Sequence, residues 1–223
     1  MASKRPTSGP GAASPKAARS RGKQSEEQRR SAILQHAVRH FARLGYAGAD
    51  LDALASDVGC AKGTLYLYFD SKQDLFHAAV DFVMRGLLAE TSRSESADDL
   101  VQLEDAVRAY LTYFDVHPEY VELLMLERAE FRDRKKPTYF EHRETNRKRW
   151  RKRFEDLMDA GRLRRLPPDL VLDAIGNLLY GTIFTNYFTG RRGSLERQVA
   201  GILDVIFHGV LGPSETPRRK PRP

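Results

Sequence analysis

Cysteine is nearly absent from this chain of 223 residues, which contains a single one, Cys60. One thiol cannot form an intramolecular disulfide, and no Cys/His spacing resembles a zinc site. We therefore expect no disulfide framework, no metal site and no cofactor. Cys60 falls in a turn between two predicted helices, where a small buried apolar side chain is needed; a redox-sensing thiol is the alternative role.

The sequence also lacks the local signatures of common enzyme active sites. It has no glycine-rich phosphate-binding loop and no nucleophile elbow around a serine. The acidic pairs Glu26-Glu27 and Asp98-Asp99 stand at predicted helix starts, where carboxylates act as caps. We therefore predict that the protein is not an enzyme.

No segment suits export, membrane insertion or a β-sheet. Residues 1–24 contain no apolar stretch long enough for a secretory signal. The most apolar predicted helix, 168–189, is interrupted by Asp173, Asn177 and Asn186, which argues against a bilayer span. No strand-like alternation of apolar and polar residues persists. The sequence therefore predicts a cytoplasmic, all-helical protein.

Positive charge is concentrated at the two ends of the chain. The formal net charge is +7, but residues 1–24 carry six Lys/Arg and no acid, and residues 212–223 carry four Lys/Arg and one Glu. Both segments are poor in apolar residues, so we expect two disordered basic tails. The first tail could also act as a basic arm that reaches the DNA minor groove.

The most informative stretch is 51–72, LDALASDVGCAKGTLYLYFDSK. Asp50 is a good N-cap for its first helix, and Gly59 is a good terminator. A second short helix is predicted over Lys62–Phe69, and a longer one from about Lys72. The first helix repeats apolar residues at helical spacing: Leu51, Leu54, Ala55 and Val58.

Two short helices around a glycine-containing turn form a helix-turn-helix, whose second helix enters the DNA major groove. A small helix pair buried in any helical protein is the alternative. Residues 26–84 closely resemble the N-terminal domain of the TetR/AcrR family of bacterial transcriptional regulators, through AILQHAVRHFARLGYAGADLDALASDVG and AKGTLYLYFDSKQDLF. The resemblance implies that residues 25–70 form a DNA-binding domain.

Several side chains of the second helix have the chemistry for DNA contacts. Lys62 can donate to guanine O6 or N7, and Thr64 can contact a base edge or a thymine methyl. Gly63 allows close approach of the backbone, while Tyr66 and Lys72 suit phosphate oxygens. Together with the family resemblance, this predicts one DNA-contacting set: Lys62, Gly63, Thr64, Tyr66, Leu67, Tyr68 and Lys72.

Two residues depart from the family pattern. Ala61 stands where the family usually has a Ser or Thr that caps the recognition helix, and this loss costs about 1 kcal/mol of helix stability. Asp50 stands where a Thr often meets a phosphate. A carboxylate there is repelled by DNA unless its capping bonds hold it back. Both departures affect the expected contact geometry more than the fold.

The remaining pattern predicts further helices and a second domain over residues 71–211. In the first helix, His36 and His40 are expected on the exposed side. The fold class is thus all-α, with an N-terminal three-helix helix-turn-helix domain and a C-terminal helical domain for ligand binding and dimerisation. The predicted helices span about 25–44, 71–91, 98–116, 118–131, 138–160, 168–189 and 194–211.

The last two predicted helices, 168–189 and 194–211, are too apolar for one small core. We expect them to pair with the same helices of a second copy as a four-helix bundle. The predicted dimer interface is Leu195, Val199, Ile202, Ile206, Phe207 and Val210.

An effector pocket between the C-terminal helices is also expected, with ordinary core packing as the alternative for each residue. The basic run 143–153 is predicted to be a solvated helix face, because its charges spread around the circumference with few acidic partners; recognition of an anionic ligand is the alternative. The candidate pocket residues are Tyr110, Phe114, Trp150, Asn177, Tyr180, Phe184 and Tyr187.

These observations predict a ligand-responsive transcriptional regulator, a repressor that binds a palindromic operator as a homodimer and is released by a small molecule. Its expected partners are double-stranded operator DNA, an unknown effector and a second copy, with no membrane. One alternative is an activator or architectural DNA-binding protein without a ligand. Another is a helical small-molecule-binding protein that does not bind DNA.

Overall fold

The computed structural model describes residues 15–209, and all regular structure within that range is helical. The predictions for the two tails fall largely on residues 1–14 and 210–223, which lie outside the described residues. The helices are α1 (Pro15–Gly48), α2 (Leu51–Val58), α3 (Lys62–Tyr66), α4 (Lys72–Glu90), α5 (Asp99–Asp115), α6 (Pro118–Glu130), α7 (Thr138–Asp159), α8 (Pro168–Thr189) and α9 (Leu195–His208).

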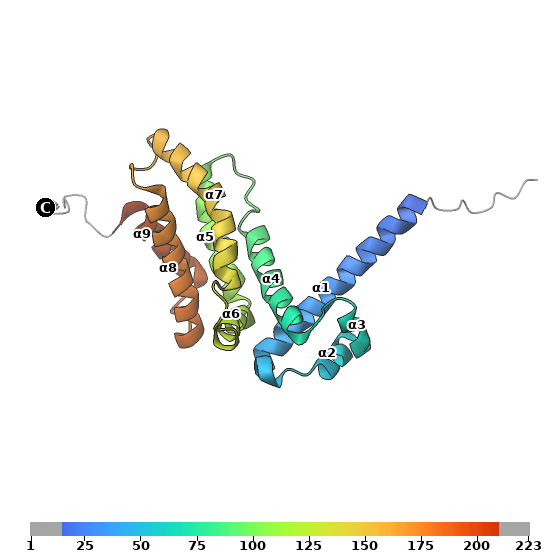
Figure 1. Ribbon diagram of the computed structural model, residues 1–223. Coiled ribbons are helices and arrows are strands. Elements are labelled where there is room, and N and C mark those ends of the chain that lie inside the picture. Colours follow the sequence, from blue (N-terminus) through green and yellow to red (C-terminus); the bar gives the residue numbers. More distant parts are fainter. Residues whose placement is uncertain (1–14, 210–223) are drawn as a thin grey trace, which may run out of the picture.

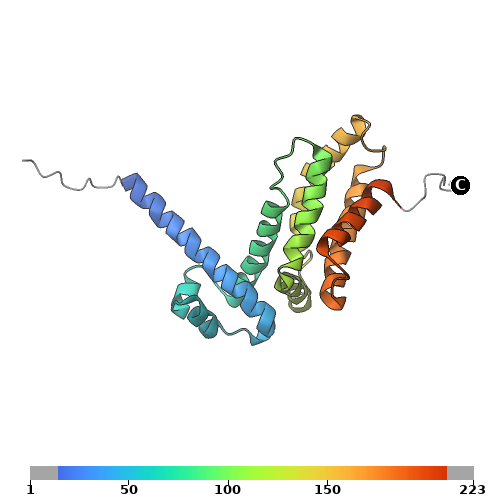
Figure 2. The same cartoon turned by 180° about the vertical axis from the view of Figure 1, so that it is seen from behind.

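The helices form a small N-terminal unit and a larger bundle, joined by α4 (Figure 1). Helices α2 and α3 lie beside the C-terminal part of α1, whose N-terminal part projects away from the bundle. Helices α7 and α8 lie on one face of the bundle, and α5 and α9 lie on the other, as the view from behind shows (Figure 2). The helix-turn-helix therefore sits at one end of the molecule.

The first helix starts earlier than the sequence predicts. We expected it to begin at Ser25, but α1 begins at Pro15. Alanine, lysine and arginine in residues 15–24 are good helix formers, and proline suits a first turn. The predicted end is confirmed, because Gly45 has φ 71° and interrupts the regular helix directly after Leu44.

Helix α4 packs on both parts of the molecule. Near its start, the Phe76 ring meets Phe41 of α1 edge to face, with 5.1 Å between ring centroids. Further along, Val83 and Leu87 join the same buried cluster as Val107 of α5. The hydrophobic core is therefore continuous from the helix-turn-helix into the bundle, and α4 is the element that connects them.

A buried carboxylate fixes the start of α7 beside α4. Glu127 of α6 accepts hydrogen bonds from the Thr138 hydroxyl at 2.6 Å and from the Thr138 backbone N–H. It is also paired with Arg134 at 2.6 Å, and that guanidinium lies 3.2 Å from His77 Nδ1 of α4. Because every partner is within hydrogen-bond reach, this buried charge is well compensated.

The prediction for His40 is wrong. Its side chain is buried between α1 and α2, where Nδ1 lies 3.7 Å from Asp57 Oδ2, and neither ring nitrogen has a hydrogen-bond partner among the described residues. In the sequence pattern, His40 lies next to the apolar stripe of the helix and not within it. Helix α2 crosses α1 at this point and covers a wider face than the stripe alone indicated.

Candidate nucleic-acid interface and effector cavity

Helix α2 has the boundaries that its sequence predicts. The Asp50 carboxylate accepts a hydrogen bond from the Asp52 backbone N–H at 2.9 Å and so caps the first turn. Gly59 ends the helix with φ 76° and ψ 37°, a left-handed conformation that glycine adopts without strain. Leu54 and Ala55 are buried and face the core.

Helix α3 is shorter than predicted and ends at Tyr66 instead of Phe69. After Tyr66 the turn tightens, because the Leu67 N–H bonds to the Thr64 carbonyl three residues back. This turn directs the Phe69 ring into the core. The Arg30 guanidinium lies over the Phe69 ring, 5.2 Å from its centroid. Leu65 is the other buried anchor of the helix.

The predicted DNA-contacting residues of this segment differ in exposure. Lys62 and Gly63 are exposed, and Tyr66 and Leu67 are 48% and 83% exposed. A Cβ atom on Gly63 would meet no protein atom within 4 Å, so the protomer itself does not require glycine there. The other two members of the helix-turn segment are half-buried: Thr64 and Tyr68.

The two lysines of the predicted set already have partners in the protein. Lys62 Nζ donates to Asp52 Oδ2 at 2.7 Å, and this hydrogen bond raises the pKa of Lys62. Lys72 Nζ donates to the Ala47 carbonyl at 3.1 Å and lies 5.1 Å from the Tyr46 ring centroid. Sequence reasoning missed both contacts, because each joins residues on different helices.

The cap of α3 is missing, as the sequence predicts. Ala61 occupies the N-cap position and makes no side-chain hydrogen bond. Helix α4 does have such a cap. The hydroxyl of Ser71 accepts a hydrogen bond from the Asp74 backbone N–H at 3.0 Å. The first N–H groups of α3 therefore face solvent without a side-chain acceptor.

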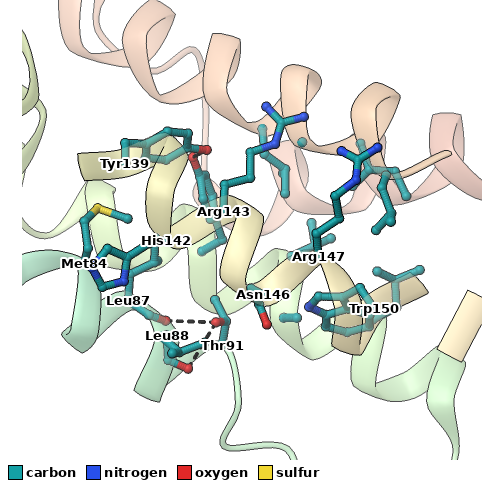
Figure 3. Close-up of a pocket in the computed structure, with 18 of the residues that line it drawn as sticks. Met84, Leu87, Leu88, Thr91, Tyr139, His142, Arg143, Asn146, Arg147 and Trp150 are labelled. Carbon is teal, nitrogen blue, oxygen red and sulfur yellow. Dashed lines mark hydrogen bonds between the residues drawn. The ribbon is translucent and has the colours of Figure 1, made fainter. Parts of the chain in front are cut away.

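A cavity of about 160 Å³ lies inside the bundle (Figure 3). Its walls come from the second half of α4, the middle of α5, most of α7 and the first half of α8, and most of the lining side chains are apolar. The lining residues are Met84, Leu87, Leu88, Thr91, Leu103, Ala106, Val107, Tyr110, Tyr139, His142, Arg143, Asn146, Arg147, Trp150, Phe154, Leu172, Ile175, Gly176 and Leu179.

The residues predicted to line one effector pocket lie at several different sites in the structure. Tyr110 and Trp150 line this cavity. Phe114 and Tyr187 line a separate groove of about 70 Å³ between α5, α6 and α8. Three other candidates on α8 do not line the cavity. Asn177 accepts a hydrogen bond from Arg143 at 2.9 Å, and the rings of Tyr180 and Phe184 meet at a tilt of 50° with centroids 4.7 Å apart.

Two tyrosine hydroxyls provide a buried polar point at the cavity. The hydroxyl groups of Tyr110 and Tyr139 lie 2.8 Å apart. Burial raises the pKa of Tyr110 well above its usual range and that of Tyr139 to about 12. Both hydroxyls are therefore neutral near pH 7, and they can donate or accept hydrogen bonds without placing a charge in the cavity.

The basic run of α7 has more acidic partners than the sequence predicts, although Lys148, Arg149, Arg151 and Lys152 are exposed, as expected of a solvated face. Arg147 pairs with Asp173 at 2.7 Å and with Asp169 at 3.0 Å, and Arg143 lies 3.3 Å from Asp173. Figure 3 shows both arginines extended from α7 toward α8. The acidic partners lie on a different helix, about twenty to thirty residues later in the chain, so the local pattern of the run did not reveal them.

One cavity residue also contacts α4 through a polar bond. His142 lines the cavity, and its Nε2 lies 2.8 Å from Asp81 Oδ1 of α4. Because a carboxylate only accepts, the imidazole N–H is the donor in this pair. Asp81 also pairs with Arg85 one turn further along α4, at 2.9 Å.

Part of the predicted dimer interface lies inside the protomer. Val199 is fully buried and Ile202 is 9% exposed, because α9 packs this face on α5. Assigning these two residues to a dimer interface was therefore wrong. Leu195, Ile206 and Phe207 are half-buried, and Val210 lies outside the described residues.

Helix α8 buries only one face in the protomer, although its sequence is apolar nearly all round. Leu179 and Ile183 are buried. The opposite face leaves large apolar side chains in solvent, with Leu170 58% and Phe188 67% exposed, and Val205 of α9 is also exposed. The described residues of the chain therefore leave a wide apolar surface on α8 and α9 uncovered.

The part of the chain that the structure describes contains neither a membrane-spanning helix nor a metal-binding cluster. No helix there combines the length and apolar character needed to cross a bilayer. Among the same residues, no three His, Cys, Asp or Glu side chains gather into a group that suits a metal ion.

The chain is similar to a family of known regulators in its N-terminal part. The family described as "Bacterial regulatory proteins, tetR family" matches residues 33–79. The HTH-type transcriptional repressor SCO4008 of Streptomyces coelicolor is 32% identical over 105 residues, which cover 47% of this chain and 52% of the repressor. The chain thus spans about half the length of this curated relative.

Two solved structures share the fold over most of this chain. The TetR-family regulator PfmR from Thermus thermophilus has a TM-score of 0.65 at 21% identity, covering 81% of this chain and 99% of PfmR. The regulator FadR from Bacillus subtilis, in complex with stearoyl-CoA, has a TM-score of 0.67 at 18% identity, covering 81% of this chain and 98% of FadR. At these identities the likeness establishes the fold.

The missing cap of α3 leads to a stability prediction. Ala61→Ser should raise the free energy of unfolding by about 1 kcal/mol, because a hydroxyl at this position can accept from a free N–H of α3. Urea unfolding followed by circular dichroism measures the change. Ala53→Ser, at an exposed site inside α2, is the matched control and should be neutral or slightly destabilising. An Ala61→Ser variant no more stable than the wild type would contradict the prediction.

Proposed function

We propose that this chain, which belongs to the TetR family of bacterial regulatory proteins, is a transcriptional repressor that binds operator DNA as a homodimer and is released by a small molecule. The observation that carries the proposal is the exposed surface of α3. Lys62, Gly63 and Tyr66 face solvent there, although the helix behind them is anchored by buried Leu65. Packing alone does not require such a set.

The proposed roles follow the chemistry of each side chain. Lys62 and Thr64 would contact base edges, and Tyr66 would bind phosphate. Lys72 would bind phosphate only after its ammonium turns away from the Ala47 carbonyl. Gly63 would allow the start of α3 to approach the floor of the major groove, since no protein atom is near its Cβ position.

A second copy is the proposed occupant of the uncovered α8–α9 surface. The exposed positions of α8 combine apolar with small residues, and small residues let helix backbones approach closely. Pairing α8 and α9 with their symmetry mates would form a four-helix bundle and place two α3 helices for half-sites about 34–36 Å apart. The surface comprises Leu170, Ala174, Leu178, Gly181, Phe188, Gly201 and Val205.

The proposed effector is a small, largely apolar molecule bound in the bundle cavity. A cavity of about 150 Å³ with apolar walls can hold benzene. The cavity in this bundle has a similar volume, about 160 Å³. The fold neighbour FadR was solved with stearoyl-CoA, which supports effector binding within this fold without identifying the effector of this chain. Tyr110 and Tyr139 would provide the uncharged hydrogen-bonding groups that orient the molecule.

Helix α4 is the proposed connection between effector and DNA. Met84 and Leu87 line the cavity in its second half, while Phe76 packs on α1 in its first half. An effector that binds better when α4 is displaced would favour the form with the wrong spacing between recognition helices. Release from DNA then follows from this difference in affinity.

Selection from a pool of randomised DNA duplexes tests the proposed activity. The wild-type protein should enrich two-fold symmetric sequences, because each half-site would be read by one copy of α3. Their affinity should exceed that for random duplex by at least about a thousandfold at physiological salt. A protein that enriches no sequence would contradict the proposal of operator binding.

The dimer surface is tested by Phe188→Glu. An unpaired charge buried in an apolar interface is costly, so this variant should become a folded monomer with an unchanged circular dichroism spectrum and greatly weakened operator binding. Sedimentation and a DNA titration on the same sample measure both effects. Thr189→Glu adds the same charge at the next, exposed position and should remain a dimer. A Phe188→Glu dimer with full operator affinity would refute this interface.

The connection through α4 is tested by removing the bond between His142 and Asp81. A thermal-shift screen of apolar compounds of benzene size and larger would first identify a molecule that binds the wild type. Asp81→Ala should still bind it, but the loss of DNA affinity that the molecule causes should shrink by about fivefold or more.

Arg85→Ala provides the control for this variant, because it removes the other partner of Asp81 and leaves the bond to His142 in place. Its response to the compound should match that of the wild type. If Asp81→Ala releases DNA as completely as the wild type, the bond to His142 does not transmit the effect.

A further inference from the structure

The ion pair between Lys62 and Asp52 joins the two helices of the helix-turn-helix on their outer surface. Lys62 is the first residue of α3, Asp52 lies in the first turn of α2, and Nζ is 2.7 Å from Oδ2. Both side chains are substantially exposed, at 43% and 63%. The pair thus lies at the start of the helix that the proposed function assigns to the major groove.

The pair is not needed to hold α2 against α3. Buried Leu54, Ala55 and Leu65 already join the two helices, and exposed ion pairs contribute little to folding. The cap of α2 is provided by Asp50, which leaves the carboxylate of Asp52 free for Lys62. Among the described residues, no hydrogen bond reaches the second oxygen of Asp52.

The chemistry of the pair matches one kind of base pair. A lysine ammonium has three protons, so one can remain on Asp52 while the others reach the O6 and N7 acceptors of guanine. The free carboxylate oxygen of Asp52 can accept from the N4 amino group of the paired cytosine. On an A·T pair adenine keeps N7 but presents an N6 amino donor in place of O6, so Lys62 loses one of its two acceptors, and thymine O4 repels a carboxylate.

We propose that Asp52 is a specificity-determining residue, which positions Lys62 on the guanine of a G·C pair and accepts a hydrogen bond from the cytosine. This inference rests on the proposed operator binding. Without Asp52, Lys62 is a flexible cation that can bind any phosphate. With Asp52, part of that charge is neutralised away from the correct base pair, so binding to random DNA is weakened as well.

The test compares the wild type with Asp52→Asn on three DNA probes. These are a site selected from the randomised pool, the same site with its G·C pair at the α3 position changed to A·T in both half-sites, and a random duplex of equal length. For the wild type, the change to A·T should weaken binding by at least about tenfold. Asp52→Asn should lose most of this discrimination and bind the random duplex more tightly.

Asp57→Asn is the matched control, because it removes one carboxylate from the same helix at a position that faces His40 and not Lys62. It should keep the wild-type preference. In a Lys62→Ala background, Asp52→Asn should cause a smaller further loss of base discrimination than it causes alone, because only the bond from cytosine is then left to remove. A purely structural role of Asp52 would instead lower the melting temperature and leave base preference unchanged.

Each outcome separates the two proposals. If the Asp52→Asn variant folds and keeps the full preference for G·C, the proposed role of Asp52 in base selection is wrong. The same follows if the site selected by the wild type has an A·T pair at that position. A wild type that enriches no sequence contradicts operator binding itself. If Asp52→Asn is poorly folded, Asp52→Ser provides the same comparison with a hydroxyl that is favourable near a helix start.

Discussion

The structure depends most on the packing of α4, which is shared by two hydrophobic surfaces. Its first half is held against α1 through Phe76 and Phe41, and its second half forms one wall of the bundle cavity. A packed helix does not stretch, and close-packed interiors transmit displacements. Any change in the position of its cavity end must therefore move the surface that supports α2 and α3, or break the contact with α1.

Charges are arranged mainly as pairs between helices. Asp169 and Asp173 of α8 neutralise the arginines of α7, and Asp81 of α4 binds His142. The predicted recognition surface follows the same rule, because Lys62 is held by Asp52. Within the described residues, several cations are thus neutralised by carboxylates that come from another helix.

The sequence predicted the helix-turn-helix well because its signals are local. The cap of α2 by Asp50, the left-handed turn at Gly59 and the missing cap at Ala61 each depend on residues within a few positions of one another. The cavity was predicted less well. Tyr110 and Trp150 line it, but His142 and Arg147 were not among the candidates, because aromatic spacing does not reveal which side of α7 meets α4 and α8.

The amino-acid sequence by itself determined the helices, their caps and the order of apolar faces, since hydrogen bonding and periodicity act along the chain. The tertiary structure decided how those faces are used. Val199 and Ile202 became protomer core because α5 covers them, while Leu170 and Phe188 stayed exposed because no part of residues 15–209 covers that side of α8. Likewise, Asp52 met Lys62 only because the turn at Gly59 brings two short helices together.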